Sequence, residues 1–493
     1  MKTKLIFFII SVSITLSSFS QNKNDSLSPL NKLKFTIDSL KKDKTLKNEQ
    51  WSFCVKKIDN DSLICKYKSD TGLIPASTMK VITTIAAIKI LGEEFRFKTF
   101  LGYDGKINKD SILKGNIFII GGGDPTLGSC RFGSNDSLVL SHWTEIIKNK
   151  GIKKIDGNII ANADFFKDSI IPASWDTADI GNYYGAGCAG LNFNENSYNI
   201  YFKSGKYIGD ATSIVSVSSE ISNIKFINNV KTGNKWSGDN VIIYSHPYSD
   251  EIRCEGTIPF GAKKFIVKGS VPDPAYFCAF QLYKTLAANK ITISGNATTT
   301  RKNKNLKSDN LIIIDTIYSP SLKEIIKETN LKSVNIFAEA LLKMCGKIKY
   351  NYGSTTKGIS AILDYWKSRG VNLNNLIMKD GSGLSASNRV SANQFVEILI
   401  AATKEPFFQT FYESLPVVGQ SGSIKNICKN SQADGNVRAK SGFMKNVRAY
   451  VGYVDTKSKQ QLAFSFLVNN YECTPAEMKK KIEKIIMLMA ELY

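Results

Sequence analysis

Ser77 and Lys80 place a hydroxyl and an amine three positions apart, on one face of the first turn of a predicted helix. A lysine in that position can take the serine proton if its surroundings lower its pKa, and a helix N-terminus favours negative charge developing beside the serine. The same spacing also begins at Ser20, Ser39, Ser111, Ser222 and Ser354. Only Ser77 follows a Pro-Ala pair and precedes an apolar helix. Its nearest rival is Ser354, for which the alternative is a helix N-cap.

Two further motifs add polar groups of the same kind. Ser333 and Asn335 offer a hydroxyl and an amide at the start of a predicted helix, and Lys440-Ser441-Gly442 comes just before two predicted strands. Each pattern occurs elsewhere in the chain and, taken alone, is more typical of a surface. Their order, with Ser-x-x-Lys first, Ser-x-Asn in the middle and Lys-Ser-Gly near the end, is typical of penicillin-recognising serine acyltransferases.

Histidine and cysteine narrow the possible chemistry. His142 and His246 are the only histidines among 493 residues, so a hydrolytic site is expected to use a base other than histidine. The nine cysteines form no Cys-x-x-Cys pair and no metal-ligand spacing, which predicts no metal site. Cys54 and Cys65 flank a turn, where either a cross-strand disulfide or two buried free thiols would fit.

The elements that must position these residues come from both ends of the chain. Alternating residues predict a hairpin over 51–67 and two strands over 447–454 and 462–468, and a helix over 77–91 ends at Gly92. Helical spacing recurs over 321–328, 333–345, 359–368 and 392–403, and Thr474 begins a last helix. Residues 98–301 consist mostly of short β-rich runs separated by turns, with one helix over 276–288. We therefore expect a discontinuous α/β domain with inserted, mostly β material.

The N-terminus and the charge bear on location. Residues 1–20 have a basic start, a short apolar run and a small-residue exit, which predicts a secretory signal peptide cleaved near Ser20. The net charge is +22. In an exported protein this charge indicates anionic envelope polymers or a membrane surface as partners rather than nucleic acid, and a generally lysine-rich surface is the alternative. The last helix carries lysines beside an apolar stripe, so it either lies on a membrane or packs behind the terminal sheet.

With these motifs in order, the sequence resembles the D-alanyl-D-alanine carboxypeptidase/endopeptidase family, the low-molecular-weight penicillin-binding proteins with inserted domains. Other stretches also resemble family segments, namely Gly121-Gly122-Gly123-Asp124-Pro125-Thr126-Leu127, residues 182–187 and 191–196, Asp380-Gly381-Ser382-Gly383-Leu384-Ser385, and Leu415-Pro416-Val417-Val418-Gly419. The resemblance runs from about residue 30 to the end. Two features depart from the family pattern: Ser441 replaces the commoner threonine, and cysteines are unusually many.

The resemblance implies an α/β fold with a transpeptidase/β-lactamase-like domain, an antiparallel sheet flanked by helices, carrying two inserted, mostly β domains. On this sequence the first domain covers 27–97 and 306–493, the second 98–193 and 266–305, and the third 194–265. It also implies an exported enzyme of the periplasm or cell envelope. Peptidoglycan stem peptides are then the substrate and β-lactams the acylating inhibitors, with no metal or organic cofactor.

Carried onto this sequence, the family's roles fall on the three motifs. Ser77 is the nucleophile, and Lys80 is the base, its ammonium destabilised by nearby Lys440. Ser333 relays a proton, and Asn335 holds Lys80 and the substrate backbone. The substrate's terminal carboxylate binds Lys440 and Ser441 of the Lys440-Ser441-Gly442 motif, and the oxyanion lies between the backbone N–H groups of Ser77 and Phe443.

Some alternatives stay open. Asp179 lies in a loop where some family members place an acid near the substrate's side-chain ammonium; Asp176 is a rival, and a plain turn acid is a third interpretation. A serine β-lactamase shares the three motifs, although about 200 inserted residues argue against a single compact lactamase. A catalytically inactive peptidoglycan-binding protein would use the same groove, but the intact motif set argues against it. The balance between carboxypeptidase and endopeptidase activity is left open.

Overall fold

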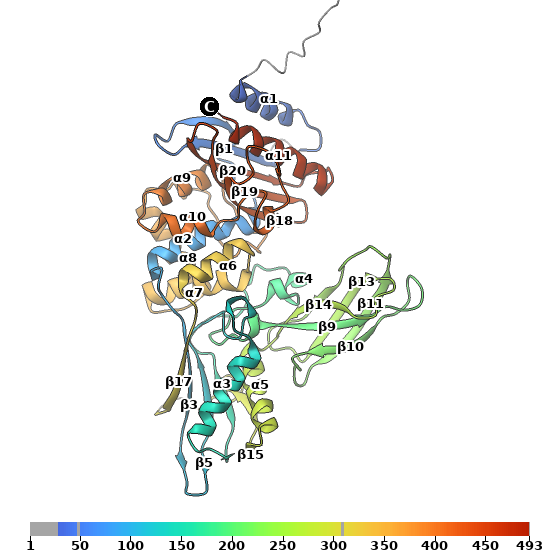
Figure 1. Cartoon of the computed structure of the whole chain (residues 1–493), viewed down its shortest axis with the longest axis vertical. Coiled ribbons are helices and arrows are strands. Elements are labelled where there is room, and N and C mark those ends of the chain that lie inside the picture. The colour runs from blue at the N-terminus through green and yellow to red at the C-terminus, as the bar shows by residue number, and fades with distance from the viewer. Residues whose placement is uncertain (1–27, 47–49, 307–309, 493) are drawn as a thin grey trace, which may run out of the picture.

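A five-stranded antiparallel sheet built from both ends of the chain organises the largest part of the molecule (Figure 1). The structure is a computed structural model that describes residues 28–46, 50–306 and 310–492, so the predicted signal peptide over 1–20 lies outside the described residues. The strands run in the order β18 (Val437–Met444), β19 (Val447–Asp455), β20 (Gln461–Asn469), β1 (Trp51–Lys57) and β2 (Leu63–Tyr67). The N-terminal hairpin thus continues the C-terminal one, as the alternating patterns predicted.

Helices cover both faces of this sheet. One face holds α1 (Pro29–Lys41) and α11 (Pro475–Ala490), whose apolar residues share a core with the sheet. The other face holds a second core formed with a helical layer. The helices of that layer are α2 (Met79–Leu91), α6 (Leu322–Leu331), α7 (Asn335–Tyr350), α8 (Thr355–Ser368), α9 (Ala392–Thr403) and α10 (Phe408–Ser414). The arrangement is the predicted helix-flanked antiparallel sheet.

Local signals fixed several helix ends. The C-cap of α2 is Gly92, with φ of 87°, and Thr474 caps α11 in a capping box with Glu477. The stripe Met478, Ile482, Ile485 and Ile486 of α11 is buried against the sheet. The interpretation of α11 as a membrane-surface helix is therefore wrong, because its apolar face is already covered.

The inserted residues form four further sheets below and beside the helical layer (Figure 1). A five-stranded sheet contains β16 (Ala297–Thr299), β8 (Ile159–Asn162), β6 (Ile117–Gly121), β3 (Lys98–Tyr103) and β17 (Ile312–Tyr318). A four-stranded sheet contains β15 (Thr292–Ile293), β7 (Lys154–Ile155), β5 (Ile112–Lys114) and β4 (Lys106–Ile107). The helices α3 (Asp136–Asn149) and α5 (Pro274–Ala288) pack with these two sheets.

Two three-stranded sheets complete the insertion and extend to one side in Figure 1. Their strands are β10 (Ser213–Ser218), β9 (Ser197–Lys203) and β14 (Phe265–Ser270), and β11 (Lys225–Gly233), β13 (Glu251–Pro259) and β12 (Ile242–Tyr244). The short helix α4 (Thr177–Ile180) lies between this part and the helical layer. The fold class is α/β with inserted, mostly β material.

Strand pairing bears on two of the expected domain boundaries, while the three-domain division itself stays a prediction. Strand β17 pairs with β3, so the sheet that begins at Lys98 takes in residues up to 318, beyond the expected boundary at 306. Strand β14 pairs with β9, so residues 265–270 belong to the sheet that begins at Ser197. Both pairings depend on hydrogen bonds between distant strands, which local patterns do not reveal.

All nine cysteines are free thiols. The expected alternative of a Cys54–Cys65 disulfide is not formed, because Cys65 lies opposite Val55 and Cys54 opposite Lys66. Neighbouring positions of a strand point to opposite faces, so the two sulfurs face away from each other. Within the described ranges, no helix is both long and apolar enough to cross a membrane.

Candidate active site

Ser77 lies in a single turn of 3-10 helix, Ala76–Thr78, that leads directly into α2. Ala76 has φ of 46°, a left-handed conformation that is uncommon for a residue with a side chain and that recurs at functional sites. One turn later, Lys80 is fully buried, and its Nζ lies 3.2 Å from Ser77 Oγ. The structure thus brings the predicted hydroxyl and amine into contact.

Two further acceptors hold the Lys80 amine. Its Nζ donates to Asn335 Oδ1 and to the carbonyl oxygen of Ser382, each at 2.6 Å. Burial lowers the pKa of Lys80 to about 7, although the nearby carboxylates Asp380 and Glu339 act to raise it. We expected nearby Lys440 to destabilise this ammonium, but the cause of the lowered pKa is burial.

Lys440 and Ser333 form the second contact of the site. Ser333 has φ of 59°, which ends the extended chain before α7 and explains why that helix begins at Asn335 rather than at Ser333. Lys440 is fully buried, and its Nζ donates to Ser333 Oγ at 3.0 Å. Burial, together with repulsion from Lys80, lowers the pKa of Lys440 well below its usual value. Repulsion between the two lysines therefore acts on Lys440.

Strand β18 passes close to the turn that carries Ser77. A Cβ placed on Gly442 would lie 2.6 Å from the carbonyl oxygen of Pro75 and 3.2 Å from the Ser77 nitrogen, so this close approach requires glycine. Phe443, the next residue, lines the cleft and is 66% exposed, with its ring against the Arg448 guanidinium. The two residues whose backbone N–H groups were predicted to bind the oxyanion, Ser77 and Phe443, therefore lie on neighbouring segments, the turn before α2 and strand β18.

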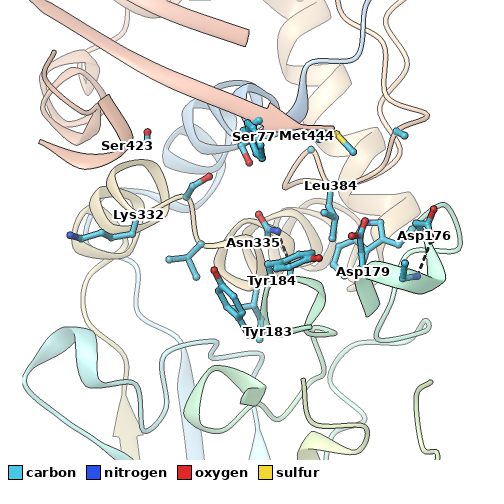
Figure 2. Close-up of a pocket in the computed structure, with 18 of the residues that line it drawn as sticks. Ser77, Asp176, Asp179, Tyr183, Tyr184, Lys332, Asn335, Leu384, Ser423 and Met444 are labelled. Atoms are coloured by element: carbon cyan, nitrogen blue, oxygen red, sulfur yellow. Dashed lines mark hydrogen bonds between the residues drawn. The ribbon is translucent and has the colours of Figure 1, made fainter. Parts of the chain in front are cut away.

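The predicted residues meet in a cleft of about 930 Å³ between the helical layer and the insertion. Figure 2 shows Ser77 with Lys332 and Ser423 toward one side and Asp176 and Asp179 toward the other. Among the predicted residues, the lining includes Ser77, Asp179, Ser333, Asn335, Ser441 and Phe443. Lys80 and Lys440 are buried behind this surface.

Asp179 and its rival Asp176 both line the cleft but differ in their contacts. Asp176 caps α4, and its Oδ1 accepts from the Ala178 N–H at 2.9 Å. Asp179 is half-buried, and burial raises its pKa while a hydrogen bond with Tyr184 opposes that effect. Tyr184 also accepts through its carbonyl oxygen from Asn335 Nδ2 at 2.7 Å, so the loop that contacts Asp179 also contacts Asn335.

Sequence reasoning missed the acidic residues that hold the Lys80 acceptor in place. Buried Glu339 accepts from the backbone N–H groups of Gly381 and Ser382 through Oε1, at 3.0 and 2.7 Å. Buried Asp380 accepts from Trp175 Nε1 at 2.8 Å and from two N–H groups of its own loop. Glu339 lies one helical turn after Asn335, and this spacing is the signal that could have identified it.

Ser423 was also missed, and Ser354 is explained. The Oγ atoms of Ser423 and Ser441 lie 2.6 Å apart at the cleft surface, and no motif marks Ser423. Ser354 caps α8, where its Oγ accepts from the Lys357 N–H at 3.1 Å. Its partner in the spacing, Lys357, lies over the Tyr350 ring instead. Ser354 is thus the N-cap that the alternative interpretation proposed.

Comparison with known proteins identifies the class. Residues 33–492 match the D-Ala-D-Ala carboxypeptidase 3 (S13) family, and the chain belongs to that family. It is 26% identical over 428 residues to a D-alanyl-D-alanine carboxypeptidase of Actinomadura sp. (strain R39), covering 84% of this chain and 76% of the relative. It is 24% identical over 501 residues to the D-alanyl-D-alanine carboxypeptidase DacB of Haemophilus influenzae, covering 100% and 97%.

A solved structure agrees in fold. The crystal structure of penicillin binding protein 4 (dacB) from Haemophilus influenzae superposes with a TM-score of 0.79 at 22% identity, covering 92% of this chain and 98% of that chain. A second structure of that protein, complexed with a β-lactam, has a TM-score of 0.73. The protein is thus an enzyme of the serine-type D-Ala-D-Ala carboxypeptidase class, as the sequence resemblance predicted.

Proposed function

We propose that the protein cleaves the peptide bond between the two terminal D-alanines of peptidoglycan stem peptides through an acyl-enzyme on Ser77. The observation that carries this mechanism is the 3.2 Å contact between Ser77 Oγ and Lys80 Nζ, in an amine whose pKa is about 7. An amine of that pKa is neutral in about half of the molecules at neutral pH and in most of them above it, so it is able to accept a proton. Serine is thereby activated without histidine.

The chemical steps follow from these contacts. Ser77 Oγ attacks the carbonyl carbon and gives its proton to the Lys80 amine. When the carbon–nitrogen bond breaks, the proton that Lys80 took is passed to the leaving D-alanine amine through Ser333, which Lys440 contacts at 3.0 Å, and Lys80 is neutral again. Lys80 then takes a proton from the water that attacks the ester and returns it to Ser77 Oγ as the shortened peptide is released. Asn335 holds Lys80 in line and binds the substrate backbone.

Substrate charge is met at two places in this mechanism. Ser441 and Ser423 receive the terminal carboxylate at the cleft surface, and Lys440 supplies positive charge behind them once that anion raises its pKa. The oxyanion accepts hydrogen bonds from the backbone N–H groups of Ser77 and Phe443. The close approach of Gly442 to Ser77 supports this assignment.

β-Lactams are expected to acylate the same serine, because their ring carbonyl takes the place of the scissile amide. A β-lactam complex of the Haemophilus influenzae protein supports this expectation. We also infer export to the periplasm or cell envelope from the signal-peptide pattern of residues 1–20, and we retain the three-domain division as the working organisation of the chain.

Incubation of the purified protein with muropeptides, read by mass spectrometry, tests this function. Loss of one D-alanine from pentapeptides indicates carboxypeptidase activity, and conversion of cross-linked dimers to monomers indicates endopeptidase activity. Absence of both products, with intact binding, would replace the proposal by an inactive binding protein. Rapid release of hydrolysed penicillin would indicate a β-lactamase instead.

The acylation rate should depend on pH with a rising limb. Burial lowers the pKa of Lys80 to about 7, and only the neutral amine accepts the Ser77 proton. The rate is therefore expected to rise about tenfold per pH unit below this pKa and to level off above it. Stopped-flow acylation by a chromogenic β-lactam across this range measures the limb. A rate independent of pH through neutrality would contradict Lys80 as the base.

Asp179 is expected to recognise a cationic side chain at the third position of the stem peptide. Because one acid in a partly exposed cleft contributes ~1–3 kcal/mol through a charge-assisted hydrogen bond, Asp179→Asn should lower kcat/KM for amine-bearing peptides several-fold or more. Peptides with an acetylated amine should be turned over at nearly the wild-type rate. An equal loss of kcat/KM on both substrates would mean that Asp179 only shapes its loop. A loss confined to amine-bearing peptides in Asp176→Asn would assign the recognition of the cation to Asp176 instead.

A further inference from the structure

The far end of the third inserted unit gathers exposed apolar side chains and lysines. Loops 203–211, 231–240 and 259–264, which we call the tip, are joined by backbone hydrogen bonds. Gly209 N–H donates to the Thr232 carbonyl at 2.8 Å, and Ser204 N–H to the Ala262 carbonyl at 2.9 Å. The opposite end of the same strands contacts the body, where Ser270 N–H donates to the Gly181 carbonyl at 2.9 Å. In Figure 1, β11 and β13 lie at the side of the molecule away from the helical layer.

The apolar side chains of the tip are unusually exposed. Trp236 is 88% exposed, and Tyr207, Ile208 and Phe260 are 62%, 64% and 41% exposed. All four come from the three joined loops, so they gather at one end of this unit. Clustered exposed apolar groups of this kind mark interaction surfaces, whereas single ones are normal.

Lysines surround this patch. Six exposed lysines lie in the three loops: Lys203, Lys206, Lys231, Lys235, Lys263 and Lys264. Lys206 and Lys235 lie over the rings of Tyr207 and Trp236, at 5.3 and 5.4 Å from the ring centroids. None of the six forms a salt bridge in the part of the chain that the structure describes.

The acids of the tip do not offset this charge. The loops contain Asp210 and Asp239, which accept hydrogen bonds from the backbone N–H groups of Tyr207 and Val241 at 2.8 and 3.0 Å. Six lysines against two aspartates leave the tip positive, so its electrostatic complement is an anionic surface.

We propose that the tip binds peripherally to a bilayer containing anionic lipids, with Trp236, Tyr207, Ile208 and Phe260 at the level of the headgroups. Tryptophan and tyrosine favour this interface because one part of the ring is apolar and the other polar, and lysine stems bury their carbons while the ammonium meets phosphate. A glycan strand fits less well, since it needs a groove with convergent polar groups. The active-site cleft and three other cavities of the described chain, each defined by its lining, contain no tip residue.

The protein carries its own probe for this contact. Of its five tryptophans only Trp236 is exposed, since Trp51, Trp143 and Trp366 are fully buried and Trp175 is 6% exposed. Vesicles containing phosphatidylglycerol should shift the emission of Trp236 to shorter wavelength and protect it from acrylamide. Vesicles of phosphatidylcholine alone should have a much smaller effect, and added salt should weaken binding.

Variants locate the contact by vesicle sedimentation. Trp236→Ala combined with Ile208→Ser should weaken binding about tenfold or more, and Lys206→Gln or Lys235→Gln about fivefold each. Tyr318→Ser is the matched control, because Tyr318 is 55% exposed beneath Lys98 but lies on β17, away from the tip. Thermal melting confirms that each variant is folded.

Three results would overturn the proposal. Unchanged Trp236 emission with both vesicle types would show that no bilayer contacts the tip. Wild-type binding by the double variant would place a membrane contact elsewhere. Protection of Trp236 by isolated sacculi but not by vesicles would assign the tip to the cell-wall polymer. None of these readouts depends on acylation of Ser77, so failure here leaves the proposed catalytic function unaffected.

Discussion

Lys80→Ala is expected to slow acylation of Ser77 by ~10²–10⁴-fold, the range typical of removing a general base. The loss arises because, among the described residues, Lys80 supplies the amine that hydrogen-bonds to Ser77 Oγ. The Lys440 amine donates to Ser333 Oγ and to the Ser441 carbonyl oxygen rather than to Ser77. The acylation rate by a fluorescent penicillin measures the effect, and circular dichroism checks that the variant is folded. Near-normal acylation by a folded variant would refute the role of Lys80.

The matched control for Lys80 is another buried lysine. Lys343 of α7 is fully buried, and its Nζ lies 2.9 Å from Asp168 Oδ1 and 2.8 Å from the Ser169 carbonyl oxygen. Lys343→Ala should lower stability, because it leaves buried acceptors without a partner, but should keep acylation in the folded fraction close to wild type. The pair of variants therefore separates loss of the base from loss of a buried ammonium.

Ser77→Ala is expected to abolish labelling by fluorescent penicillin. The proposed mechanism places the acyl-enzyme bond at Ser77 Oγ, which lies 3.2 Å from Lys80 Nζ, whereas Ser333 Oγ accepts a hydrogen bond from Lys440 Nζ. Mass mapping of the wild-type protein should find the label on the peptide that contains Ser77. Ser354→Ala is the matched control, since its hydroxyl caps α8, and it should be labelled like the wild type. A label on Ser354 or any other residue would end the assignment.

Local sequence predicted much of the scaffold. The strands β19 and β20 and the helix α9 lie where alternation and helical spacing placed them, although both strands are buried on both faces. The end of α2 at Gly92 and the capping box of α11 likewise depend on only a few adjacent residues. The three motifs, read in order, also indicated the family that the comparison with known proteins then confirmed.

Partners distant in sequence could not be predicted in this way. The Ser423–Ser441 contact and the Trp175–Asp380 hydrogen bond join residues 18 and 205 positions apart, and the pairing of β17 with β3 sets Tyr318 opposite Lys98. The periodicity of a segment does not indicate such a contact, because each of the two segments follows its own local pattern whether or not the other is its partner. The same holds for the disulfide alternative, which was decided by a register that sets Cys65 opposite Val55.

The sequence by itself predicted which groups form the candidate site, namely the hydroxyls of Ser77 and Ser333, the amines of Lys80 and Lys440 and the amide of Asn335. Only the tertiary structure decided the state of those groups. The pKa of Lys80 falls to about 7 because packing removes water from its ammonium, and the Ser382 carbonyl, on a loop held by Glu339, fixes the direction of its hydrogen bonds. Desolvation depends on everything packed around a side chain, and so it exists only once the whole chain has folded.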